Sequence, residues 1–111
     1  KPETQRTLGS WVSIGDLAQL CRIGLETPDL HHEIVFGMSD NSRTWWDNKT
    51  ARRLGYQPGD SSDIWAAEVD NSGIPEPGDA VGLAVQGGPF ASEGYQGDPL
   101  RVAARNAQSK P

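Results

Sequence analysis

The chain contains only one cysteine, Cys21, and two histidines among its 111 residues. A single thiol cannot form a disulfide within the chain and cannot complete a zinc site, so nothing indicates an oxidising compartment. His31 and His32 are adjacent, which makes them project in different directions, and no third metal ligand lies near them in the sequence. The sequence therefore predicts a turn at the histidine pair and no bound metal.

Long apolar runs are also missing. No stretch of 18 or more apolar residues occurs, and no charged segment followed by an apolar one resembles a secretory leader. A membrane-spanning helix needs about 20 predominantly apolar residues, and a signal peptide needs a shorter apolar run after basic residues. We therefore expect no membrane partner and a cytoplasmic location.

Basic residues are few, and the formal net charge is -5. The densest basic stretch is the pair Arg52-Arg53 together with Lys49. Nucleic-acid binding needs clustered Lys and Arg that displace counterions from phosphates. These three side chains are better explained as a solvated helix face or as cations near a helix C-terminus. Nucleic acid is accordingly not an expected partner.

Two motifs of dinucleotide-dependent enzymes, a glycine-rich phosphate loop and a Tyr-x-x-x-Lys pair, are absent from the sequence. Without such a loop at a helix N-terminus the chain has no cradle for a pyrophosphate. The apolar fraction without glycine is 35%, and glycine adds 13 residues, whereas typical soluble domains have roughly 45–50% with glycine included. Glycine and proline are densest between Gly73 and Pro99. We therefore expect a thin core that is built mainly before residue 70.

The residues that are present predict a helix from Ser13 to Thr27. Ser13 is a good N-cap, and Asp16 follows three residues later as a variant of the capping box. Pro28 ends the segment. The helix should present one apolar stripe to the core, with Cys21 on it as a small packed residue rather than a nucleophile. The stripe consists of Ile14, Leu17, Ala18, Cys21 and Leu25.

A buried β-strand is predicted from Glu33 to Met38, because the run is rich in β-prone apolar residues and ends at a polar cluster. A short helix should follow Asp47 or Asn48 and end at Gly55. The residues Asp60-Ser61-Ser62 then offer an N-cap for another short helix that reaches Val69. Alternation of helix and strand is typical of an α/β protein.

Two adjacent tryptophans, Trp45 and Trp46, lie in the loop between these elements. Because side chains at successive positions usually face opposite ways, one ring is expected on the core and the other on a neighbouring element. Stacking against a carbohydrate is the alternative interpretation of this pair.

The chain resembles the C-terminal part of extended short-chain dehydrogenases, the NAD-dependent epimerase/dehydratase family, and within that family it is most similar to uronate dehydrogenases. The resemblance extends from about Lys1 to Gly94. The following runs carry it: Arg6-x-x-x-x-Trp11-Val12-x-x-x-Asp16-Leu17-Ala18, Val35-Phe36-Gly37-Met38-Ser39-x-Asn41-x-Arg43-x-Trp45-Trp46-Asp47-Asn48, Leu54-Gly55-Tyr56-x-Pro58-x-Asp60-Ser61 and Gln86-Gly87-Gly88-x-Phe90.

This resemblance implies a fold and an organisation. The chain would be the substrate-side part of an α/β, Rossmann-type enzyme and would lack the N-terminal nucleotide-binding half. Residues 1–70 would form a helix and strand substrate subdomain. Residues 71–96 would form a Gly/Pro-rich closing loop. Residues 97–111 lie beyond the resemblance, and their sequence pattern alone predicts a flexible tail.

The resemblance also implies a reaction. The parent enzyme would oxidise the anomeric carbon of a hexuronic acid, pass the hydride to NAD and release an aldarolactone. Its catalytic Tyr, Lys and Ser would lie upstream of Lys1, so the chain alone should be inactive and contains no catalytic residue. The implied partner is a small-molecule sugar acid, and the parent is expected to be a homo-oligomer. A nucleotide-sugar epimerase or dehydratase and a non-catalytic binding module are the alternatives.

Two residues of this chain match substrate-binding positions of the family. Arg6 matches the arginine that holds the carboxylate of the sugar acid, a role that suits the two parallel N–H bonds of a guanidinium. Phe90 matches an aromatic residue on a loop that closes over the substrate. A solvated arginine and a loop phenylalanine pinned to the core are the alternatives. Asp16 is explained by its helix start, and Asn41 and Arg43 are better explained as loop-stabilising residues than as ligands.

Overall fold

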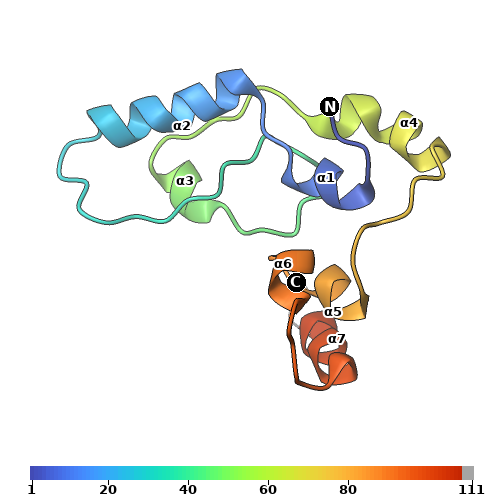
Figure 1. Cartoon of the computed structure of the whole chain (residues 1–111). Coiled ribbons are helices and arrows are strands. Elements are labelled where there is room, and N and C mark those ends of the chain that lie inside the picture. The colour runs from blue at the N-terminus through green and yellow to red at the C-terminus, as the bar shows by residue number, and fades with distance from the viewer. Residues whose placement is uncertain (109–111) are drawn as a thin grey trace. The chain divides into compact units, whose positions relative to one another are not determined.

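A computed structural model describes residues 1–108, which form two separate units (Figure 1). The first unit extends from Lys1 to Ile74, and the second begins at Pro75. The first contains α1 (Gln5–Ser10), α2 (Ile14–Glu26), α3 (Lys49–Arg53), the 3-10 helix η1 (Ser62–Trp65) and α4 (Ala66–Asn71). The second contains α5 (Ala80–Ala84), α6 (Pro89–Ser92) and α7 (Pro99–Gln108).

Helix α1 forms in a segment whose sequence shows neither an apolar pattern nor a usual capping box. The Thr4 hydroxyl accepts the Thr7 N–H at 3.2 Å, and the Thr7 hydroxyl accepts the Thr4 N–H at 2.8 Å. These reciprocal bonds satisfy two N–H groups that a helix start leaves unpaired. The helix buries Leu8 completely. The sequence does not reveal this Thr-x-x-Thr start, because a capping box usually has Glu or Gln at the fourth position.

The predicted helix after Ser13 is confirmed as α2, and the Ser13 hydroxyl accepts the Asp16 N–H at 3.0 Å. The Ser13 N–H donates to the Ser39 hydroxyl rather than to Asp16, so Asp16 does not complete a capping box. The predicted burial of the apolar stripe is wrong. Leu25 is 87% exposed and Cys21 is exposed, while Leu17 is 45% exposed.

The predicted strand from Glu33 to Met38 is also wrong: the residues 1–108 contain no β-strand. A strand needs a neighbouring strand whose backbone pairs with its N–H and C=O groups. Here the Asn48 side chain pairs with Phe36 instead, accepting its N–H at 3.1 Å and donating to its carbonyl at 2.8 Å. Ile34 is 72% exposed, so the segment is not buried. The described residues are therefore helical and irregular, and the prediction of an α/β fold is not confirmed in this part of the chain.

The other short helices of the first unit follow their predicted caps. Gly55 has φ 97°, the left-handed conformation of a helix C′ residue, and follows Leu54, the C-cap of α3. The Ser61 hydroxyl accepts the Asp63 N–H at 3.2 Å at the start of η1, which continues into α4. The buried apolar residues of this unit are Leu8, Met38, Ala51, Tyr56 and Val69.

The second unit is helical where the composition predicted a loop and a tail. Asp79 caps α5 by accepting the Gly82 N–H at 2.8 Å. Gly88 has φ 60° and places Pro89 at the first turn of α6, where proline needs no N–H partner. Helix α7 occupies most of the expected tail, and residues 109–111 lie outside the described part of the chain.

Candidate functional site

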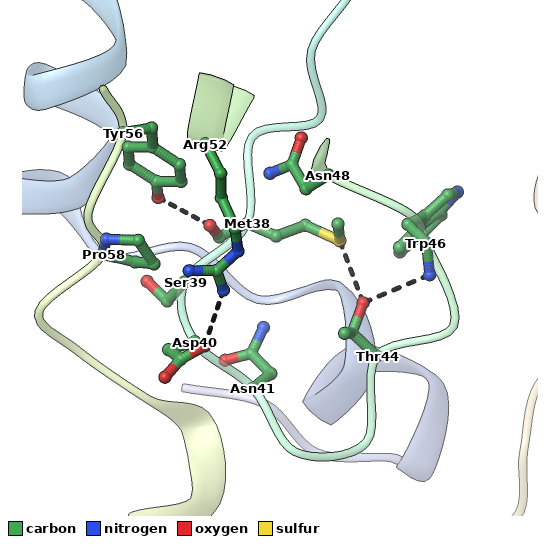
Figure 2. Close-up of a pocket in the computed structure, with 10 residues that line it drawn as sticks. All are labelled: Met38, Ser39, Asp40, Asn41, Thr44, Trp46, Asn48, Arg52, Tyr56 and Pro58. Carbon is green, nitrogen blue, oxygen red and sulfur yellow. Dashed lines mark hydrogen bonds and ion pairs between the residues drawn. The ribbon is translucent and has the colours of Figure 1, made fainter. Parts of the chain in front are cut away.

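The first unit contains a small cavity of about 80 Å³ (Figure 2). Pockets for small-molecule ligands usually enclose about 300–1,000 Å³, so this cavity is too small to hold a sugar acid by itself. It is lined by Met38, Ser39, Asp40, Asn41, Thr44, Trp46, Asn48, Arg52, Tyr56 and Pro58.

Tyr56 is the aromatic residue with the deepest burial around this cavity. It is 2% exposed, and its hydroxyl donates to the Met38 carbonyl at 2.6 Å (Figure 2). Burial is the main cause that raises the pKa of Tyr56 to about 12, and the Asp16 carboxylate adds to this effect. A phenol with such a pKa remains protonated at neutral pH and is a poor general base. The Tyr56 hydroxyl therefore ties its segment to the Met38 backbone.

Asp16 lies at the centre of a buried polar network. Its carboxylate accepts the Ser39 hydroxyl at 2.5 Å, the Gly59 N–H at 2.8 Å and the Asp60 N–H at 3.2 Å. Burial alone would raise the pKa of Asp16, but the hydrogen bonds from Ser39 and from the Gly59 and Asp60 backbone outweigh it and lower the pKa. Asp16 is thus an ionised acceptor that holds three segments together, which explains it without acid catalysis.

Asn41 extends this network to the start of the chain. Its amide donates to the Trp11 carbonyl at 2.7 Å, and its carbonyl oxygen accepts the Ser62 N–H at 2.9 Å. The Ser62 hydroxyl donates to the Leu8 carbonyl at 2.7 Å. Among the described residues no buried side-chain nitrogen or oxygen lacks a partner. The loop-stabilising interpretation of Asn41 is confirmed.

Arg43 likewise joins elements of the first unit. Its guanidinium donates to both carboxylate oxygens of Asp70, at 2.7 and 2.8 Å, and also bonds the Gln5 side chain. Hydrogen bonds from Arg43 and Gln5 hold the pKa of Asp70 well below its usual range. Arg43 therefore ties its loop to α4 and to the start of α1.

Arg6, the predicted carboxylate ligand, lies on α1 and is half-buried. Its guanidinium carbon lies over the ring of Trp45, 5.4 Å from the ring centroid. A cation within about 6 Å of a tryptophan centroid is attracted by the ring face. Arg6 therefore contacts a neighbouring side chain, while its role as a carboxylate ligand stays a prediction.

The expectation that Trp45 and Trp46 face opposite ways is wrong. Their rings are stacked with centroids 4.6 Å apart and an interplanar angle of 24°. Trp46 is stacked in turn on Phe36 at 5.8 Å. The alternation rule holds for extended backbone, whereas residues 44–47 form a bent loop. The two contacts use ring surface that a sugar would need for stacking.

Phe90 lies on α6 in the second unit and is 93% exposed. This exposure contradicts the alternative in which the ring is pinned to the core. Arg6 and Phe90 belong to different units of the chain. The substrate-closing role of Phe90 stays a prediction.

In the part of the chain that the structure describes, no group of three or more His, Cys, Asp or Glu side chains gathers in an arrangement suited to a metal ion. None of the described helices is long and apolar enough to cross a membrane.

No protein-family model matches the chain. The uronate dehydrogenase of Pseudomonas syringae pv. tomato is 41% identical over 98 residues, which cover 88% of this chain and 35% of that protein. The solved glucuronic acid dehydrogenase of Chromohalobacter salexigens matches with a TM-score of 0.68 and 36% identity, over 90% of this chain and 36% of that one. A mutant uronate dehydrogenase of Agrobacterium tumefaciens, complexed with NAD, matches with a TM-score of 0.62 and 30% identity, over 73% of this chain and 31% of that one.

The proteins to which the chain is similar are dehydrogenases. The chain matches a C-terminal part of an NAD-dependent dehydrogenase. The proteins that carry this match are uronate dehydrogenases, as the sequence motifs predicted. The chain spans about a third of the length of the curated relatives it matches.

Proposed function

We propose that the chain is the substrate-binding part of a uronate dehydrogenase-like oxidoreductase that acts in the cytoplasm as a homo-oligomer. The observation that carries the proposal is the match to uronate dehydrogenases over 88% of the chain at 41% identity. In the proposed reaction the hydride on the anomeric carbon of a hexuronic acid passes to NAD, the hydroxyl proton passes to a base, and a lactone is left.

NAD, when bound, supplies the hydride acceptor. The described residues support a division of labour in which this chain contributes recognition rather than proton transfer. Tyr56 is a buried phenol with a pKa of about 12, and Asp16 is occupied as a structural acceptor. Arg6 is the proposed ligand of the substrate carboxylate, which a guanidinium can bind through two charge-assisted hydrogen bonds. Phe90 is the proposed apolar cover that excludes water from the closed site.

The first test is the coding DNA upstream of Lys1. A glycine-rich loop after a predicted strand and a Tyr-x-x-x-Lys pair support the proposal, whereas a native start codon at this point contradicts it. The full-length protein should then reduce NAD with galacturonate or glucuronate as substrate. Activity only with a nucleotide-sugar would replace the proposal by the epimerase or dehydratase alternative. The 111-residue chain alone should show no activity.

Arg6→Lys in the full-length protein tests the proposed carboxylate ligand. Lysine keeps the charge but cannot form two parallel bonds, so the Michaelis constant for the uronate should rise by at least roughly tenfold, the scale of a lost charge-assisted contact. The matched control is Arg22→Lys, because Arg22 lies on the exposed surface of α2 and only approaches Glu26 at 3.7 Å. Steady-state kinetics of both variants provides the measurement, and an unchanged constant for Arg6→Lys rejects the role.

A further inference from the structure

Aromatic rings form a continuous stack that ends at Arg6. The order is Arg6, Trp45, Trp46 and Phe36, with 5.4 Å from the guanidinium carbon to the first centroid and 4.6 and 5.8 Å between successive centroids. All four residues belong to the first unit. The stack therefore lies entirely within the unit Lys1–Ile74.

The backbone of α1 lies directly against the Trp45 ring. A Cβ atom built on Gly9 would lie 2.5 Å from a ring carbon of Trp45 and 2.8 Å from the Arg43 carbonyl oxygen. Gly9 follows Arg6 by three residues, a spacing that places both on one side of a helix. The ring thus contacts the helix surface from which Arg6 extends, and only glycine permits that distance.

The loop that carries Trp45 is held at both ends. On its N-terminal side, Arg43 bonds Asp70 and Gln5, and Gln5 immediately precedes Arg6. On its C-terminal side, Asn48 pairs with both the N–H and the carbonyl of Phe36, the last ring of the stack. These contacts restrict how far the Trp45 ring can move relative to α1.

We propose that Trp45 is a positioning residue for the substrate carboxylate: its ring fixes the guanidinium of Arg6 in the place where the sugar acid is bound. This inference rests on the proposed function. The ring attracts the cation electrostatically, whereas a carboxylate accepts hydrogen bonds from its N–H groups, so both can act on the same guanidinium. A preorganised arginine loses less conformational entropy when substrate binds. Trp46 and Phe36 support the ring and need not contact the substrate.

The test is Trp45→Leu in the full-length protein, with hexuronate and NAD as substrates. We expect the Michaelis constant for the uronate to rise about threefold to tenfold, the range of a lost cation–π contact, with kcat changed less than about twofold. Preference for the uronate over the neutral sugar of the same configuration should fall by a similar factor. Trp45→Phe keeps a ring and should restore most of the affinity.

A matched control separates positioning from a general loss of stability. Trp65 is half-buried in the same unit and packs edge to face on Trp11, with centroids 4.9 Å apart. Trp65→Leu should lower the thermal unfolding midpoint but leave the Michaelis constant and the preference for uronate unchanged.

The possible outcomes distinguish this inference from the proposed function. A wild-type protein without uronate activity overturns both. An active wild type in which Arg6→Lys weakens uronate binding but Trp45→Leu does not overturns the positioning role alone. A loss of affinity in Trp45→Leu that Trp65→Leu reproduces also overturns it, because the effect would then come from stability.

Discussion

Helices α1 and α2 follow one another in the chain, yet their packing is opposite. Helix α1 has six residues, no amphipathic pattern recognisable from the sequence, and a completely buried Leu8. Helix α2 has 13 residues and a clear apolar stripe, but Ile14 is 90% and Leu25 is 87% exposed. The comparison shows that an apolar pattern can mark a helix such as α2 without predicting its burial, and that a helix without such a pattern can still bury a leucine.

Leu8→Ala should have the largest effect on stability. Removing a fully buried leucine side chain costs the transfer free energy and leaves a cavity, together about 2–5 kcal/mol. Urea unfolding of the chain, followed by circular dichroism, measures the change. If the same substitution at Leu25 costs as much as at Leu8, the contrast between the two helices does not hold in solution.

Asp16→Asn should have an intermediate effect, about 1–3 kcal/mol. One carboxylate oxygen accepts Gly59, and the other accepts Ser39 and Asp60. In either orientation, the amide nitrogen of an asparagine would face donors: the Gly59 N–H, or the Ser39 hydroxyl together with the Asp60 N–H. Denaturant unfolding at neutral pH measures the loss, and Asp29→Asn is a control at an exposed aspartate in the turn after α2.

The same carboxylate should make stability pH-dependent. The pKa of Asp16 is lower in the folded chain than the usual aspartate value of about 3.9, which applies to the unfolded chain. The stability that the Asp16 carboxylate contributes is therefore complete above about pH 4, and it is lost as the pH falls through the lowered pKa of the folded state. The free energy of unfolding, measured at several pH values between about pH 2 and pH 6, should change less steeply with pH in Asp16→Asn than in the wild type. Equal slopes would mean that other carboxylates cause the acid sensitivity.

Leu25→Ala should have the smallest effect, within about 0.5 kcal/mol. The side chain is mostly exposed, and alanine and leucine are both good helix formers. Circular dichroism of the 111-residue chain should show unchanged helix content and an unfolding midpoint close to that of the wild type. A large loss would show that this face is covered in solution.

Local signals predicted part of the fold. Ser13, Gly55 and Ser61 marked helix ends correctly because capping is decided by a few neighbouring residues. The segment 33–38 was wrongly predicted as a strand because β-structure depends on a second segment that the sequence pattern cannot supply. The start of α1 was missed because Thr7 takes a position where Glu or Gln is usual.

The candidate site was predictable to a different extent. Arg6 and Phe90 were found through resemblance to a family, since neither has a distinctive local pattern. The sequence does not predict that Trp45 packs against Arg6 and Gly9, because this packing joins α1 to a loop about 40 residues later in the chain. A glycine three residues after a candidate arginine was the available signal, but glycine occurs at 13 positions and has many uses.

The contact between Gly9 and Trp45 also constrains how this protein can vary. Any side chain at position 9 would enter the space of the ring or of the Arg43 carbonyl. Alanine at position 9 should therefore be tolerated best when a smaller residue replaces Trp45, although the backbone oxygen still limits the gain. In a library of variants the two positions should change together rather than independently.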